Sequence, residues 1–162
     1  MKFSKWTSIK GILLAALILF WLPLFLQPKA SSAPFENVVQ SAMAGLDLGS
    51  YPQKDVQSIK ALLKTDPSSY ENIAFFRTDD GLNASELVIA KFSSSQSAQE
   101  FASKMEERRS AQENMYAGYA PEAEKLMKDA QIIVMGNYGI YVSGNEAPAF
   151  VSQFEKAVKE GV

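Results

Sequence analysis

Cysteine and histidine are both missing from the 162 residues of this chain. Their absence excludes disulfides, thiol redox chemistry, ordinary zinc sites, and catalysis by Ser-His-Asp or Cys-His groups. A lipid anchor is excluded too, because lipoprotein processing needs a cysteine. An enzyme built on this sequence would have to use carboxylates, a lysine or a tyrosine, and no cofactor is expected.

Two further motifs of chemical interest are absent. The sequence has no glycine-rich phosphate loop, and beyond residue 33 it has no Ser-x-x-Lys signature of a hydrolase. The stretch Asp79-Asp80-Gly81 lacks the alternating oxygen spacing of a calcium loop, so a plain hairpin turn is predicted there. No metal site is predicted.

Acidic side chains are absent before Ala33, whereas four of the 16 basic residues lie there. Residues 33–162 therefore carry 12 basic and 18 acidic side chains, a net charge of −6. An acidic domain without a basic stripe is a poor ligand for nucleic acid, and anionic lipid repels it. We therefore expect no nucleic-acid partner.

An apolar run over residues 11–26 follows three lysines and precedes the small-residue stretch Ala30-Ser31-Ser32-Ala33. This order of basic, apolar and small residues is typical of an export signal. The run is long for a signal peptide and short of the ~20 apolar residues that span a bilayer. Residues 1–33 are therefore predicted to be either a signal peptide, cut after Ser32, or an N-terminal membrane anchor.

Both alternatives give the rest of the chain the same location. The lysines hold the amino end inside the cell, so the remainder lies outside the cytoplasmic membrane. Residues 34–162 are long enough for one domain with a hydrophobic core. We expect a single extracytoplasmic domain, either secreted or anchored to the outer face of the cytoplasmic membrane by residues 6–26. Contact with the membrane is through this N-terminal segment if it stays uncut.

Hydrophobic periodicity beyond residue 33 predicts an α+β fold. Helical spacing is found over 35–46, 53–64, 97–116, 121–130 and in a closing segment around 150–158. A capping box of Ser97 and Glu100 marks the start of the third of these helices. Strands are predicted over 72–78, 86–92, 131–135 and 138–142. Short turns join them into two hairpins, which indicates a four-stranded antiparallel sheet in a single domain, with helices packed on one face.

The long helix carries polar side chains on its apolar stripe. At 100° per residue, Arg108 and Gln112 fall within about 20° of Phe101, and Tyr119 joins them if the helical turn persists. A guanidinium that faces a core is unfavourable unless a carboxylate or carbonyls satisfy it. Glu86 begins the second strand on the face that it shares with two apolar residues, so it is the candidate partner.

Two interpretations of this cluster remain open. In the first, Glu86 and Arg108 form a structural ion pair that pins the long helix to the sheet, because interior charges are usually paired. In the second, Arg108, Gln112 and Tyr119 line a cleft that binds an anionic or polar ligand.

Several short motifs together resemble a bacterial family known as domain of unknown function 4358. The residues that carry the resemblance are Glu86 and Lys91, Arg108-x-x-x-Gln112, Gly118-Tyr119-x-Pro121-Glu122, and Gly136-Asn137-Tyr138. The resemblance covers roughly residues 47–160 and implies an export signal followed by one domain. Many relatives resemble lipoproteins with a cysteine after the signal, and this chain departs from them. The family brings no assigned activity.

Two functions from different classes fit these observations. The favoured hypothesis is an exported, non-catalytic cell-envelope module that binds a ligand or a protein partner, or has a structural role. The alternative is a carboxylate- or lysine-dependent hydrolase acting on cell-wall material, with Glu86, Lys91 and Arg108 in its site. The alternative requires an open cleft with a carboxylate of raised pKa beside these residues.

Overall fold

The computed structural model of the chain describes residues 10, 14, 17, 30–45, 51–81 and 83–161. Most of the predicted signal or anchor, and the predicted helix break around residues 49–50, lie outside these residues. Within the described part, no helix is long and apolar enough to cross a membrane.

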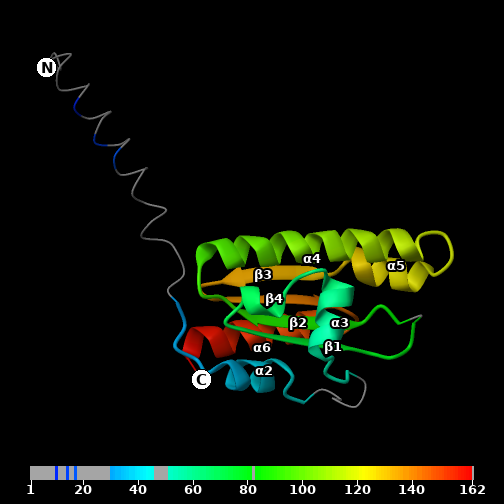
Figure 1. Cartoon of the computed structure of the whole chain (residues 1–162), viewed down its shortest axis with the longest axis horizontal. Coiled ribbons are helices and arrows are strands. Elements are labelled where there is room, and N and C mark those ends of the chain that lie inside the picture. Colours follow the sequence, from blue (N-terminus) through cyan, green and yellow to red (C-terminus); the bar gives the residue numbers. More distant parts are fainter. Residues whose placement is uncertain are drawn as a thin grey trace, which may run out of the picture.

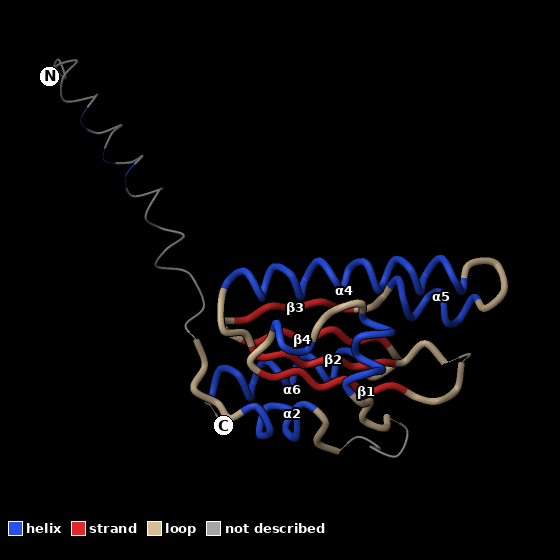
Figure 2. Tube along the Cα trace, in the orientation of Figure 1, coloured by secondary structure: helices blue, strands red, loops and turns tan. Residues whose placement is uncertain are grey.

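Four antiparallel strands form the centre of the fold (Figure 2). They are β1 (Asn72–Arg77), β2 (Glu86–Lys91), β3 (Gln131–Met135) and β4 (Tyr138–Ser143). Their order in the sheet is β1-β2-β4-β3, so each predicted hairpin is present and the two meet through β2 and β4. The turn Gly136-Asn137 places Met135 opposite Tyr138, as a two-residue hairpin requires.

Helices cover both faces of the sheet, so the prediction of one covered face is wrong (Figure 1). One face packs against α2 (Phe35–Ala42) and α6 (Ala147–Glu160), and the other against α4 (Ser95–Tyr116). The reason lies in the central strands: β4 is buried at every residue, and β2 at every residue except its last. Strands that bury both sides need cover on both sides.

The helix boundaries differ from the prediction at several places, the first being α2, which ends at Ala42 and not at residue 46. The long helix begins at Ser95, because the side chain of Ser94 accepts a hydrogen bond from the backbone N–H of Ser97. Ser94 is thus the N-cap, and the predicted capping box lies three residues too late. The predicted helix over 53–64 is divided into a single turn, α3 (Val56–Ser58), and a π-helical turn, η2 (Ile59–Leu63). A short helix, α5 (Pro121–Lys128), pairs with the end of α4.

Gly139 marks the closest approach between α4 and the sheet. A Cβ atom at this position would lie 2.6 Å from the ring of Phe92 and 2.8 Å from that of Phe101. The two rings pack on each other with centroids 5.4 Å apart. Only glycine leaves room for both, so this residue sets how closely the start of α4 sits on β4.

Candidate functional site

A buried ion pair joins α4 to the sheet. Glu86 begins β2 and is 1% exposed, and Arg108, near the middle of α4, is 8% exposed. The Arg108 Nε donates to Glu86 Oε1 at 3.0 Å, and its Nη2 donates to Oε2 at 2.8 Å. This two-point geometry is the strongest form of an arginine–carboxylate contact. The structure therefore contains the pair that the first interpretation of the cluster requires.

Three further groups complete this arrangement. The hydroxyl of Tyr141 on β4 donates to Glu86 Oε1 at 2.9 Å. Arg77 on β1 brings its Nε to 3.9 Å from Glu86 Oε2. The Nη1 of Arg108 donates to the backbone carbonyl of Leu62 in η2 at 3.0 Å. We call Glu86, Arg108, Tyr141 and Arg77 the Glu86 cluster; it ties three strands to α4.

Burial and the charges of the Glu86 cluster determine the protonation states of Arg108 and Tyr141. Burial alone would lower the pKa of Arg108, but its hydrogen bonds to Glu86 and the charge of that carboxylate outweigh burial and raise it. Burial, followed by the negative charge of Glu86, raises the pKa of Tyr141 well above its usual value of 10. At neutral pH the guanidinium is charged and the phenol is neutral, so the phenol remains a hydrogen-bond donor.

A pocket of about 440 Å³ opens beside Arg108, between η2 and α4. We call it the η2–α4 pocket. Its apolar lining consists of Ala61, Leu62, Leu63 and Ala111. Its polar lining consists of Lys64, Lys104, Glu107, Arg108 and Gln112. The volume falls within the range of small-molecule sites.

The side chain of Gln112 lines this pocket without a hydrogen-bond partner in the described structure. It is 9% exposed, yet its carboxamide makes no hydrogen bond to any residue that the structure describes. A carboxamide can donate twice and accept twice, and buried polar groups of native proteins are nearly always paired. The nitrogen and oxygen of Gln112 are not among the buried side-chain atoms that lack a partner, so the carboxamide is open to the pocket, where a ligand can bond to it.

The residue after η2 has an unusual backbone. Lys64 has φ 54° and ψ 35°, and among the residues described it is the one non-glycine with a positive φ. A left-handed lysine is strained, and single π-helical turns are frequent at functional sites. This left-handed residue ends η2 at the rim of the pocket, which Lys64 lines.

The lining of the pocket carries more basic than acidic side chains, although the domain as a whole is acidic. Three of its polar residues are cationic and one, Glu107, is anionic. Lys104 donates to Glu107 at 2.9 Å, whereas Lys64 forms no ion pair with any residue in the described ranges. Two of the five N–H groups of Arg108 also have no protein partner there, because only three are used by Glu86 and Leu62.

The other predicted site residues lie elsewhere. Lys91 is at the opposite end of β2 from Glu86, about 17 Å away along the strand and on the other face. Its ammonium pairs with Glu71 at 2.7 Å. Tyr119 is 58% exposed in the turn after α4 and does not line the pocket. The reason is that α4 ends at Tyr116, so the helical turn needed to keep Tyr119 on the stripe is missing.

Sequence reasoning missed several contributors to the site, among them Arg77 and the pocket residues Lys104 and Glu107. Tyr141 reaches Glu86 because β4 lies next to β2, with Val88 opposite Tyr141, and the strand order could not be read from the pattern. Leu62 contributes a backbone carbonyl, which the sequence does not reveal because every residue has one. Lys64 is signalled only by its place at the end of an apolar helical stretch. In the described residues, no group of three or more acidic side chains could hold a metal ion.

These features define a small α+β domain with one ion-paired cluster and one adjoining polar pocket. The model of the family described as domain of unknown function (DUF4358) matches residues 44–144, from before β1 to just after β4. The chain belongs to this family. Comparison with curated proteins and with solved structures finds no match.

Proposed function

We propose that the chain is an exported, non-catalytic binding module of the cell envelope. Its η2–α4 pocket takes a ligand that carries a carboxylate or a similar anionic oxygen group. The observation that carries this proposal is the carboxamide of Gln112, which lines the pocket without a hydrogen-bond partner in the described structure, beside the partly used guanidinium of Arg108. Whether the natural ligand is a free molecule or the end of a protein partner, the group recognised is the same.

The donors in the pocket suit an anionic oxygen. Two N–H groups of Arg108 remain without a protein partner in the described structure, Gln112 can donate two more, and Lys64 adds an unpaired ammonium. Glu86 already neutralises the charge of Arg108, and Glu107 pairs with Lys104, so the affinity for an anion depends mainly on the charge of Lys64. The four apolar lining residues suit a small aliphatic body on the same ligand.

The hydrolase alternative finds no comparable support. It needs Glu86 and Lys91 in one site with Arg108, and these two residues point to opposite faces of the sheet. Both carboxylate oxygens of Glu86 accept hydrogen bonds from Arg108, and one also accepts a bond from Tyr141. A carboxylate held in this way is not placed to attack a substrate or to move a proton.

Titration with a matched pair of probes tests the binding proposal. The full chain in mild detergent is titrated with N-acetyl-alanine and with its neutral amide, and backbone amide shifts are followed by NMR. We expect the carboxylate probe to move the signals of residues 61–64 and 104–112, and the amide probe to bind at least tenfold more weakly. Equal binding of both probes, or shifts elsewhere only, would contradict the proposal.

Two variants test whether the carboxylate probe binds in the η2–α4 pocket. Gln112→Leu keeps a similar volume but removes the carboxamide, and we expect it to weaken binding of the carboxylate probe about tenfold, the equivalent of about 1.4 kcal/mol. Tyr119→Ala removes an exposed ring outside the pocket and should leave binding unchanged. Circular dichroism confirms that both variants are folded before they are compared.

A further inference from the structure

The segment that follows the apolar run is built into the folded domain. The backbone N–H of Ser31 donates to Asn137 Oδ1 at 2.7 Å, and Asn137 Nδ2 donates back to the Ser31 carbonyl at 3.2 Å. The hydroxyl of Tyr138 donates to the Ala33 carbonyl at 2.7 Å, and Ala33 is fully buried. The side chains of Asn137 and Tyr138 thus hold residues 31–33 against the sheet through three hydrogen bonds to their backbone.

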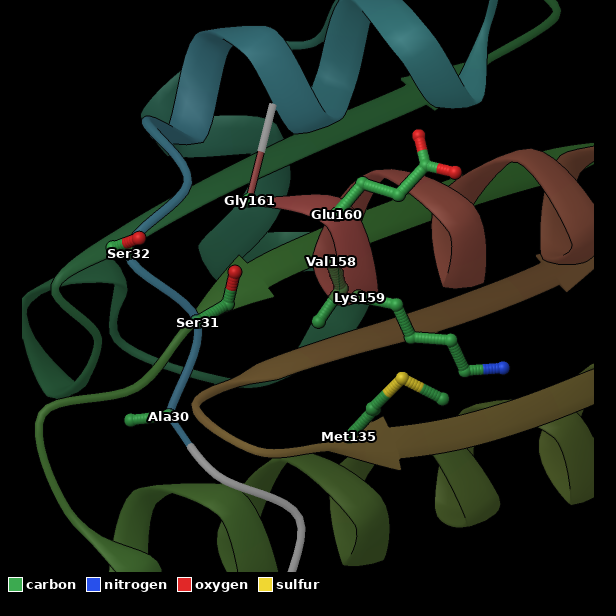
Figure 3. Close-up of a pocket in the computed structure, with 8 residues that line it drawn as sticks. All are labelled: Ala30, Ser31, Ser32, Met135, Val158, Lys159, Glu160 and Gly161. Carbon is green, nitrogen blue, oxygen red and sulfur yellow. The ribbon is translucent and has the colours of Figure 1, made fainter.

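Two distant parts of the chain meet at this segment. Residues 30–32 run beside Met135 at the end of β3 and beside the last turn of α6, and together they line a pocket of about 510 Å³ (Figure 3). Further along, the ring of Phe35 stacks on that of Tyr138 with centroids 6.5 Å apart. The path of the chain is therefore fixed from Ser31 onward.

A cut after Ser32 would damage this arrangement. It would remove Ser31, leaving the carboxamide of Asn137 without its two partners. It would also place the positive charge of a new amino terminus on Ala33, a fully buried residue. The same cut removes Ser31 Oγ, which accepts a hydrogen bond from the Ala33 N–H at 3.2 Å, so the new charge loses the partner of this nitrogen. The finished domain is therefore built to contain the residues that a signal peptidase would remove.

We infer that the apolar segment is retained as a membrane anchor and that the domain sits directly against the outer surface of the membrane. Only residues 27–30 separate the apolar run from Ser31, and four residues span at most about 14 Å. The polar layer of a bilayer is itself about 5–7 Å deep on each side. The end of the domain that carries the Gly136-Asn137 turn and the last turn of α6 therefore faces the lipid headgroups.

The retained apolar segment, and not the charge of the domain, holds the domain at the membrane surface. Residues 33–162 carry a net charge of −6, so anionic lipid does not attract them. The α4–α5 loop lies at the opposite end of the domain from residues 30–33, which points it away from the membrane (Figure 1). This inference shares only export with the proposed function, so failure of ligand binding would leave it standing.

The mass of the exported protein is the first test. The full chain is produced in a bacterial host, the membranes are extracted at alkaline pH, and the protein is analysed by intact mass spectrometry. We expect the full-length chain to stay in the membrane pellet. A main species that begins at Ala33, or at any residue after Leu26, would overturn the inference.

Limited proteolysis tests the contacts that hold residues 31–33. Asn137→Ala removes both hydrogen bonds to Ser31, whereas Asn145→Ala removes an exposed carboxamide in another turn. With the protein in membranes, we expect Asn137→Ala to be cleaved within residues 30–33 about tenfold faster than wild type, because the loss of two hydrogen bonds favours local opening. Asn145→Ala should be cleaved at the wild-type rate. Equal rates for the two variants would overturn the inference that these contacts protect the segment.

Fluorescence quenching tests the placement against the membrane. The chain has no cysteine, so single labels can be attached at Glu160→Cys, in the last turn of α6, and at Ala117→Cys, after α4. In vesicles that contain lipids with a nitroxide headgroup, we expect the label at position 160 to be quenched severalfold more than the label at 117. Equal quenching would show that this end of the domain does not face the bilayer.

Discussion

Substitution of Arg108 probes the central contact of the fold. Arg108→Met keeps most of the volume and the helix propensity of the side chain but removes its charge. Glu86 then remains 1% exposed, with Tyr141 as its direct donor and Arg77 at 3.9 Å. A buried carboxylate that loses its main partner destabilises the folded state much more than an exposed one.

The size of the effect depends on the hydrogen bonds that this substitution removes. Two charge-assisted hydrogen bonds to Glu86 disappear, each contributing about 1.5–3 kcal/mol. Tyr141 and Arg77 still stabilise the carboxylate, which reduces the loss. We therefore expect Arg108→Met to lower the free energy of unfolding by about 3 kcal/mol, the low end of the ~3–5 kcal/mol seen when a buried pair is broken.

A double-mutant cycle separates the pair from its surroundings. In the Glu86→Gln background, Arg108→Met no longer leaves a buried charge, and we expect it to be roughly 2 kcal/mol less destabilising than in the wild type. The measurement is urea unfolding of the full chain in mild detergent, followed by circular dichroism. An effect of Arg108→Met below about 1 kcal/mol, or an equal effect in both backgrounds, would refute this account of the Glu86 cluster.

An exposed pair provides the matched control. Lys125 donates to Asp129 at 2.8 Å, one helical turn away on the surface of α5 and its C-cap. Exposed pairs at this spacing contribute about 0.3–0.5 kcal/mol. Lys125→Met should therefore change the free energy of unfolding by less than about 0.5 kcal/mol in the same assay.

Three further predictions concern the packing, the backbone and the buried phenols. Gly139→Ala should lower the free energy of unfolding by about 1–3 kcal/mol in urea melts, because its Cβ would lie 2.6 and 2.8 Å from two aromatic rings. Gly81→Ala is the control: its Cβ meets no atom within 4 Å, so the free energy of unfolding should change little. Lys64→Gly should raise the free energy of unfolding by up to about 1 kcal/mol, because glycine adopts the left-handed backbone without strain. The same variant should bind the carboxylate probe more weakly. A fall in both stability and binding would contradict the role assigned to the lysine. Burial, with a smaller effect of Glu71, raises the pKa of Tyr138 to about 12, and burial also raises that of Tyr141. The unfolded chain therefore loses these protons first as the pH rises. The contribution of the two phenols to the free energy of unfolding should be complete below pH 10 and decline from pH 10 to 12. In urea melts this decline should be shallower in Tyr138→Phe.

Local patterns predict much of this fold. All four strands begin at the predicted residue and end within one residue of it, since apolar runs between turn residues are strong signals. The angular position of Arg108 on its helix, together with the strand face of Glu86, predicts their contact correctly. These features depend only on the periods of 3.6 and 2 residues.

Features that depend on tertiary context could not be predicted. The adjacency of β2 and β4, which brings Tyr141 to Glu86, is a property of the whole sheet. The left-handed Lys64 and the π-helical turn before it run against local preference, so the sequence pattern does not reveal them. The helices were predicted but their division between the two faces was not, because the sequence pattern shows that a strand is buried but not what covers it.

The hydrogen bonds between Ser31 and Asn137 join residues 106 positions apart, and α2 likewise packs on α6, the last helix. At 5–20 residues per second of synthesis, the beginning of the domain waits on the order of 5–20 s for these partners to be made. The two hairpins, whose contacts are local, have no such delay. Until the last helix arrives, the apolar side of α2 lacks its main partner, and the nascent chain is open to aggregation on that side for most of its synthesis.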